Sequence, residues 1–288
     1  MRVVVTGGSG KLGQFVVRDL AAHGHDVVNV DRQPAPVAGQ PGGFVAVDLT
    51  DYGQVLEAVS HVDERVPGPV DAVVHLAAIP APGLRTNSAT FANNSAASYN
   101  VFAAARAAGI KNVVWASSET VLGLPFDTPP PYIPVDEEYT PRPESTYSLV
   151  KTLEEEMARQ FCRWDPTLKM IGLRFSNVID PAQYVEFPSF EDDRSSRKWN
   201  LWAYIDGRDG AQAVRRALEF EHTGTEVFVI ANADSVMTTP SRDLAAEFFP
   251  GVEIRGDLEV NGTMLAIGKA RRLLGYEPAH SWRDAVTT

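Results

Sequence analysis

The chain has 288 residues, of which 44% are hydrophobic and 22% charged. This composition is typical of a globular protein with one large domain or two smaller ones, and it excludes a low-complexity disordered chain. The 26 basic and 37 acidic side chains give a net charge of −11, which repels phosphate groups and argues against general binding to nucleic acids or anionic membranes.

The single cysteine and the short apolar segments favour a soluble, cytosolic protein. Cys162 cannot form an internal disulfide or supply a thiolate metal cluster, and its neighbours Phe161 and Trp164 predict a buried thiol on a helix. We therefore expect no metal site. The apolar start of the chain is interrupted by glycines, and no segment approaches the roughly 20 apolar residues of a membrane span. The sequence predicts a soluble, cytoplasmic protein.

Short valine-rich runs alternate with amphipathic segments in the first 175 residues. Such runs are typical of buried parallel strands, and strands that alternate with helices predict a Rossmann-type doubly wound α/β sheet. The predicted strands cover residues 2–6, 26–31, 44–49, 70–77, 112–117 and 170–175. The predicted helices cover residues 12–23, 52–62, 88–108 and 145–163.

The remainder of the chain is less regular. Residues 181–202 mix aromatic, acidic and basic side chains without a clear period, which predicts a long excursion beside the substrate. Helices are expected at 210–220 and 241–248, and strands at 226–231 and 252–255. We accordingly predict a dinucleotide-binding domain of residues 1–178, to which 203–232 return, and a small C-terminal substrate lobe of 179–202 and 233–288.

A glycine-rich turn lies between the first predicted strand and the first predicted helix. Gly7 permits the tight turn, Gly10 lets the backbone approach a pyrophosphate, and Gly13 lets the helix pack closely on the strand. Because the strand and helix flank the motif as required, it predicts a dinucleotide site. The cofactor-binding residues expected in this turn are Gly7, Ser9, Gly10, Lys11, Leu12 and Gly13.

Charged residues at the ends of the next two strands bear on the choice of cofactor. Asp31 is placed to accept hydrogen bonds from the adenosine ribose, which favours NAD. The guanidinium of Arg32 could instead hold a 2′-phosphate, which keeps NADP as an alternative. Asp48, next to Leu49, is placed either to meet the adenine ring or to cap the following helix with Thr50.

Tyr147 and Lys151 stand four residues apart, and thus on one face of a predicted helix. A tyrosine with a pKa near 10 is a weak base until a nearby cation stabilises its phenolate, and Lys151 can supply that charge while it binds the nicotinamide ribose. Ser117 and Ser118 end a predicted strand and face the ligand crevice. Ser118 could hold the reacting oxygen, whereas Ser117 better suits a capping role.

These motifs resemble those of the extended short-chain dehydrogenases/reductases, the NAD-dependent epimerase/dehydratase family. The likeness covers most of the chain and identifies a family, not a substrate. It includes the glycine turn, Tyr147 and Lys151, residues 75–78, Asn94, Asn100, residues 173–178 and residues 272–278.

The resemblance implies roles for individual residues. It makes Ser118, Tyr147 and Lys151 the catalytic triad. The expected cofactor-binding residues beyond the glycine turn are Asp31, Arg32, Asp48, Leu49, Leu76, Ala77, Ala78, Asn94, Ser117, Tyr147, Lys151 and Phe175, with Phe175 beside the nicotinamide. The expected substrate-binding residues are Ser118, Glu119, Asn177, Arg197 and Trp202. His75 is interpreted as a packed strand residue.

Two departures from the family pattern narrow the reaction. Nucleotide-sugar dehydratases carry an Asp-Glu pair after the catalytic hydroxyl residue, whereas this chain has Glu119 and Thr120, which disfavours dehydration. The chain is also short for a nucleotide-sugar enzyme, and its size resembles that of uronate dehydrogenases. Those enzymes place an arginine five residues before a tryptophan, a spacing that Arg197 and Trp202 repeat. An arginine there suits a carboxylate or a phosphate equally, or is a solvated loop charge.

The sequence therefore predicts an NAD-dependent oxidoreductase that transfers hydride at a carbinol carbon of a sugar or nucleotide sugar. An epimerase would leave no net NADH, whereas an aldose or uronate dehydrogenase would release it. A non-catalytic NAD(P)-sensing protein is the alternative from another class, and the retained Tyr147 and Lys151 argue against it. The expected partner is a small sugar-type molecule, not nucleic acid or membrane, and the sequence also allows a homodimer.

Overall fold

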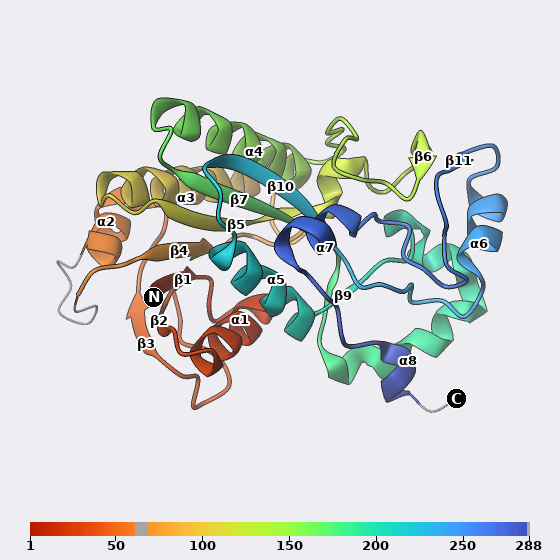
Figure 1. Cartoon of the computed structure of the whole chain (residues 1–288), viewed down its shortest axis with the longest axis horizontal. Helices are drawn as coiled ribbons and strands as arrows, with labels where there is room; N and C mark the ends of the chain where they lie inside the picture. Colours follow the sequence, from red (N-terminus) through yellow and green to blue (C-terminus); the bar gives the residue numbers. More distant parts are fainter. Residues whose placement is uncertain (61–67, 287–288) are drawn as a thin grey trace.

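A seven-stranded parallel sheet forms the centre of the computed structural model, which describes residues 1–60 and 68–286 (Figure 1). The strands lie in the order β10-β7-β5-β4-β1-β2-β3, which confirms the predicted doubly wound α/β fold. Their bounds are β1 Arg2–Thr6, β2 Asp26–Asp31, β3 Gly43–Ala46, β4 Ala72–His75, β5 Asn112–Ser118, β7 Lys169–Phe175 and β10 Gly224–Ile230.

Helices cover both faces of this sheet (Figure 1). On one face lie α2 Tyr52–Ser60, α3 Asn87–Ala107 and α4 Thr146–Trp164. On the other lie α1 Lys11–Ala22, α5 Gly207–Glu219 and α7 Gly268–Leu274. The last two residues of the helix predicted at 52–62 fall outside the described residues.

The central strands are buried on both faces, because their side chains are apolar at successive positions. Val3, Val4 and Val5 of β1 are each 0% exposed: Val3 and Val5 belong to one core cluster, and Val4 to the other. At about 25 cal/mol per Å² of buried apolar surface, this burial supplies much of the stability of the sheet. The thiol of Cys162 in α4 is also buried, as predicted, and burial raises its pKa to about 11.

Helix α5 packs against α1, the helix that follows the glycine-rich turn. Gly207, the first residue of α5, lies so close to Phe15 of α1 that an added Cβ would come within 2.3 Å of the phenyl ring. The helix begins at Gly207 and not at residue 210, because the Asp206 side chain caps it by accepting from the Arg208 backbone N–H. A segment from the second half of the chain thus packs directly on the first helix.

The C-terminal part of the chain lies beyond the carboxyl ends of the strands, beside the segments that follow β5 and β7 (Figure 1). Two short parallel ladders in this region pair segments from the middle of the chain with later segments. The ladders are β6 Tyr132–Ile133 with β11 Glu253–Ile254, and β8 Val178–Ile179 with β9 Ile205–Asp206; α6 Ser241–Phe248 and α8 Trp282–Ala285 complete this part.

The expectation that residues 181–202 are irregular needs correction. The segment η2, Pro181–Asn200, is a run of 3-10 turns with a kink at Asp193. Its side-chain spacing differs from the 3.6-residue period of an α-helix, and so no such period appears in the sequence. In the described part of the chain, no helix has the length and apolarity needed to cross a membrane.

Candidate active site

A cavity of about 1200 Å³ opens at the carboxyl ends of β1, β4, β5 and β7. Ligands of doubly wound sheets bind at this edge, at the point where the connections that follow two neighbouring strands run to opposite sides of the sheet. The structure brings most of the predicted site residues together on the cavity wall. They are Gly7, Ser9, Gly10, Lys11, Leu12, Gly13, Asp31, Arg32, Leu49, Leu76, Ala77, Ala78, Ser117, Ser118, Glu119, Tyr147, Lys151, Phe175 and Asn177.

The glycine turn forms one end of the cavity. Gly7 has φ +73°, and a Cβ there would lie 2.6 Å from the Ala77 nitrogen. A Cβ on Gly13 would lie 2.1 Å from the Gly7 carbonyl oxygen. A larger residue at position 13 would therefore prevent the start of α1 from lying so close to the turn. A Cβ on Gly10 would meet only the Gly7 oxygen, at 3.2 Å, and the backbone of Gly10 is therefore open toward a ligand.

Asp31 and Arg32 end β2 at the rim of the same cavity. The Asp31 carboxylate accepts hydrogen bonds from the backbone N–H groups of Ser9 and Arg32. The Arg32 guanidinium is bound by Asp48 at 2.9 Å, so its charge is partly balanced.

Asp48 does not line the cavity among the described residues. Its carboxylate accepts from the backbone N–H and the hydroxyl of Thr50, and these bonds, with the one from Arg32, lower its pKa to about 2. The contacts of Asp48 are thus those of the predicted cap with Thr50. They do not support the predicted contact with the adenine ring. Its neighbour Leu49 does face the cavity.

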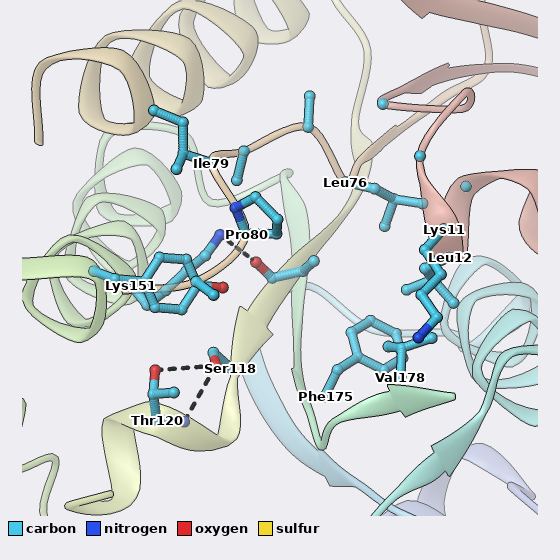
Figure 2. A pocket seen from close by; sticks show the side chains of 18 of the residues that line it. Lys11, Leu12, Leu76, Ile79, Pro80, Ser118, Thr120, Lys151, Phe175 and Val178 are labelled. Atoms are coloured by element: carbon cyan, nitrogen blue, oxygen red, sulfur yellow. Dashed lines mark hydrogen bonds between the residues drawn. The ribbon is translucent and has the colours of Figure 1, made fainter. Parts of the chain in front are cut away.

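Asn94 acts on the cavity indirectly. Its side chain is buried, accepts from the Ile79 backbone N–H at 2.8 Å and donates to the Ile79 carbonyl at 3.0 Å. The prediction that Asn94 contacts the cofactor is therefore corrected: it fixes the loop that follows β4. Ile79 and Pro80 of this loop line the cavity (Figure 2), and no motif in the sequence indicates either residue.

Ser118, Tyr147 and Lys151 meet on the wall between β5 and α4. Ser145 begins α4 with a capping box to Ser148, which sets Tyr147 in the first turn and Lys151 one turn later. The Lys151 Nζ lies 5.9 Å from the centre of the Tyr147 ring. Figure 2 shows Ser118 next to Thr120, whose backbone N–H and hydroxyl both donate to the Ser118 Oγ.

Burial and neighbouring charges shift the pKa values of Tyr147 and Lys151 in opposite directions. Burial raises the pKa of the Tyr147 phenol, while the Lys151 ammonium and the Ser118 hydroxyl lower it. The expected effect of Lys151 on Tyr147 is therefore present, but burial outweighs it. Burial also disfavours the charged form of Lys151, yet nearby carboxylates, above all Glu154, leave its pKa raised.

A buried ion pair supports the wall behind the triad. Both carboxylate oxygens of Glu155 accept from the Arg174 guanidinium, at 2.9 and 2.8 Å, and Oε1 also accepts from the Ser117 hydroxyl. Glu155 and Arg174 are 1% and 2% exposed. The Ser117 hydroxyl thus ties β5 to α4, although the residue also lines the cavity.

Glu119 is a buried carboxyl on the substrate side of the cavity. Burial raises its pKa to about 7, although Ser176, Asn200 and Arg197 lie near enough to favour the carboxylate. Oε1 accepts a hydrogen bond of 3.3 Å from Asn200, while Oε2 has no partner in the described part of the chain. The Oγ of Ser176 likewise lacks a partner among residues 1–60 and 68–286. Both atoms are buried, and both residues line the substrate side of the cavity.

Arg197 and Trp202 differ from their predicted positions, since neither belongs to the described cavity lining. The Arg197 guanidinium lies 5.0 Å from the centre of the Trp199 ring and donates to the Ala203 carbonyl. It also lies 3.1 Å from the Asn177 amide oxygen, in the amide orientation that satisfies both groups.

The predicted substrate contact of Trp202 is wrong. Leu201 and Trp202 have φ of 56° and 54°, and this left-handed turn directs the Trp202 ring into the core, where it is fully buried. The indole N–H donates to the Arg194 carbonyl. Trp199, which the sequence analysis did not single out, lines the cavity.

Comparison with known proteins agrees with this geometry. The model of the NAD dependent epimerase/dehydratase family matches residues 3–203, which confirms the resemblance seen in the sequence. A UDP-glucose 4-epimerase 2 of Oryza sativa subsp. japonica is 31% identical over 200 residues, which cover 64% of this chain and 46% of the relative. The chain spans about half the length of the curated relatives it matches.

Solved structures match over nearly the whole chain. A UDP-galactose 4-epimerase is 27% identical with a TM-score of 0.68, over 98% of this chain and 94% of the other. A mutated uronate dehydrogenase is 22% identical with a TM-score of 0.67, over 99% and 84%; at this identity the likeness concerns the fold alone.

Proposed function

The chain belongs to the NAD dependent epimerase/dehydratase family, and we propose that it binds NAD in the cavity and transfers hydride at a carbinol carbon of a sugar or nucleotide sugar. The observation that carries this proposal is the convergence of Ser118, Tyr147 and Lys151 on one wall of a cavity whose far end is the glycine turn. The volume of about 1200 Å³ exceeds the roughly 300–1,000 Å³ of a usual small-molecule site and so suits a dinucleotide with a second ligand.

The residues present fit the dinucleotide. The open backbone at Gly10 and the start of α1 would hold the pyrophosphate, and Asp31 would hold the adenosine ribose. Leu76 and Phe175 supply apolar surface for the nicotinamide end of the molecule (Figure 2). When bound, NAD would supply the hydride acceptor of the reaction.

The side chains of the triad would perform the proton chemistry. Tyr147 would remove the proton from the substrate hydroxyl during oxidation and return it during reduction. Lys151 stabilises the phenolate by its charge, and Ser118 would hold the reacting oxygen at the end of β5. Because Thr120 donates to Ser118 with its own hydroxyl, the Ser118 proton is left to donate to the substrate.

The relatives favour an epimerase that oxidises and re-reduces one nucleotide sugar. Those named above are a UDP-glucose 4-epimerase and a UDP-galactose 4-epimerase. Thr120 stands where a dehydratase would have its second carboxylate, which argues against elimination of water.

Oxidation of a sugar acid with release of NADH is a second candidate, which draws on Arg197, a residue that lies behind Asn177 of the cavity wall. The Arg197 guanidinium lies close enough to Glu119 to favour the ionised form of that side chain. The Nε of Arg197 has no hydrogen-bond partner among the described residues. The bonds of Arg197 to Ala203 and Asn177 reduce its freedom to bind a substrate carboxylate. The cytoplasmic location and a homodimer stay predictions.

Incubation with a substrate panel tests both proposals. UDP-glucose, UDP-galactose, free aldoses and free uronates would each be supplied with NAD or with NADP. An epimerase interconverts the two UDP-sugars without net NADH, whereas a dehydrogenase produces NADH in proportion to turnover. Binding of neither dinucleotide would contradict the proposed function, and binding without any turnover would favour the sensing alternative.

A further inference from the structure

The mechanism above leaves one buried carboxylate beside the triad without a role. Glu154 lies three residues after Lys151 on α4, and its side chain is 0% exposed. Its Oε2 accepts a hydrogen bond of 2.8 Å from the Lys151 Nζ. A buried charge is costly unless it is paired and hydrogen-bonded, so the position of this carboxylate needs an explanation.

Glu154 ends a continuous chain of buried hydrogen bonds that starts at β1. The Thr6 hydroxyl lies 2.7 Å from His75 Nδ1, and His75 Nε2 lies 3.1 Å from the Ser98 hydroxyl. Ser98 in turn lies 2.8 Å from Glu154 Oε1. All four residues of this chain are buried, and it connects the strand that precedes the glycine turn to the counter-ion of Lys151.

The direction of the bonds follows from the number of protons available. Burial and the charge of Lys151 lower the pKa of His75 to about 3, so the ring is neutral and donates with one nitrogen only. If Ser98 donates to the Glu154 carboxylate, it must accept from His75 Nε2–H, and His75 Nδ1 then accepts from the Thr6 hydroxyl. Every donor therefore points toward Glu154. Burial raises the pKa of the Glu154 carboxyl, and the Lys151 ammonium and the Ser98 hydroxyl oppose this by favouring the carboxylate.

The same arrangement orients the lysine. An ammonium has three donors, and Lys151 uses one toward the Ala116 carbonyl at 2.7 Å and one toward Glu154. Because Lys151 also lines the cavity, the third donor is left for a ligand there. Glu154 thus affects both the direction of the Lys151 donors and the net positive charge that Tyr147 experiences.

We propose that Glu154 is a positioning residue that holds Lys151 toward the cavity and sets the pH at which Tyr147 loses its proton. Its negative charge offsets the ammonium, so Tyr147 stays protonated to a higher pH than Lys151 alone would allow. The inference rests on the proposed function in that Tyr147 is taken as the proton-transfer group.

Other charged groups near the pair differ from Glu154 in their contacts. Glu155 also faces Lys151 from α4, but it is bound on both oxygens by Arg174. Glu119 faces Tyr147 from η1, Glu119–Leu122, and its carboxyl is directed to the substrate side of the cavity. His75 faces Lys151 from β4 and is neutral. The carboxylate in direct contact with the ammonium is Glu154.

The test is a titration of the Tyr147 phenol by its ultraviolet absorbance. The chain has eight tyrosines, so the signal of Tyr147 is obtained by subtracting the spectrum of the same protein with Tyr147→Phe. Glu154→Gln removes the charge but keeps an oxygen that can accept from Lys151. We expect its Tyr147 midpoint to fall by one pH unit or more, which is a tenfold change in the ionisation constant. NAD affinity should change by less than about threefold, because the orientation of Lys151 is kept.

Two further variants separate charge from packing. Glu154→Asp keeps the charge and should return the midpoint toward that of the parent, whereas Glu156→Gln, an exposed position on the same helix, should leave it unchanged. If Glu154→Gln does not fold, Glu154→Met supplies a second neutral side chain of similar size. Equal midpoints in the parent and the neutral variants, or an equal shift in Glu154→Asp, would overturn the proposal.

The titration is informative whether or not the proposed function holds. It is carried out with and without NAD, and circular dichroism defines the pH range in which each protein is folded. Failure of every variant to bind NAD would count against the proposed function alone. Absence of a Tyr147 signal from the neutral variants throughout the folded range would count against the role of Glu154.

Discussion

At the scale of single residues, Asp31 and Arg32 carry opposite charges at the rim of the cavity, yet their contacts differ. Asp31 is held by backbone N–H groups and faces the cavity, whereas Arg32 is paired with Asp48. A 2′-phosphate would have to approach the Asp31 carboxylate and compete with Asp48 for Arg32. We therefore expect NAD to bind more tightly than NADP.

Replacement of Asp31 tests this preference. Asp31→Ala should narrow the gap in binding free energy between NAD and NADP by about 1–3 kcal/mol, the scale of a hydrogen bond to a charged group. The two dissociation constants, measured by fluorescence titration for the parent and the variant, provide the comparison. Tighter binding of NADP by the unmodified protein would show that Arg32 determines the cofactor.

Removal of the Tyr147 hydroxyl tests the proton-transfer step. Tyr147→Phe should keep the fold and the NAD affinity but lower kcat by about 10²–10⁴-fold, the usual contribution of general acid–base catalysis. The measurement uses the best substrate from the panel, with circular dichroism as the control for folding. Retention of more than half the activity would remove Tyr147 from the mechanism.

The charge of the Glu119 carboxyl should make ligand binding on the substrate side of the cavity depend on pH. Because burial raises its pKa to about 7, Glu119 gains negative charge as the pH rises through that value. The affinity for an anionic sugar such as a uronate should therefore fall above pH 7, while that for a neutral sugar should change less. Binding isotherms at several pH values measure the effect, and Glu119→Gln should abolish it. A uronate affinity that is unchanged across this range would contradict the prediction.

At the scale of secondary-structure elements, the start of α1 depends on close contact between backbone atoms. Gly13→Ala would place a Cβ 2.1 Å from the Gly7 oxygen, which forces the helix away from the strand. We expect a loss of about 1–3 kcal/mol in stability, as for other overpacked sites, together with weaker NAD binding. Gly53→Ala, in the first turn of α2 and close only to the flexible Asp51 side chain, is the matched control and should be nearly neutral. Chemical denaturation measures both.

The elements that the sequence predicts best are those whose pattern is local. The valine run of β1 and the spacing from Tyr147 to Lys151 are visible within a few residues, and the strands and triad positions follow from them. Trp202 could not be placed in this way, because its direction depends on the left-handed turn at Leu201. Glu154 gave no signal either, since its importance comes from Ser98 and Lys151, which the fold brings together.

At the scale of the whole molecule, the cavity is built by strands from both halves of the sheet and by the segment after β7. The Lys11 side chain donates to Gln183 of η2, which joins the glycine turn to the substrate side. A ligand that fills this cavity therefore stabilises the folded chain as a unit.

NAD should accordingly raise the temperature of unfolding. At a concentration 100 times the dissociation constant, binding adds about 2.7 kcal/mol. For a protein of this size, that corresponds to an increase of roughly 4–5 °C in Tm. Differential scanning fluorimetry with NAD, NADP and adenosine alone measures the effect, and an unchanged Tm with saturating NAD would contradict cofactor binding.

The contact of α5 with α1 also limits how the chain can be divided. The family match ends at residue 203, but the helix that covers Phe15 begins at Gly207, and β10, which completes the sheet, follows still later. A fragment that stopped at residue 203 would leave the apolar face of α1 in water and the edge of β7 unpaired. During translation, the nascent chain therefore cannot complete its sheet until β10 has left the ribosome. The segment that the family model matches is therefore shorter than the segment that must fold together.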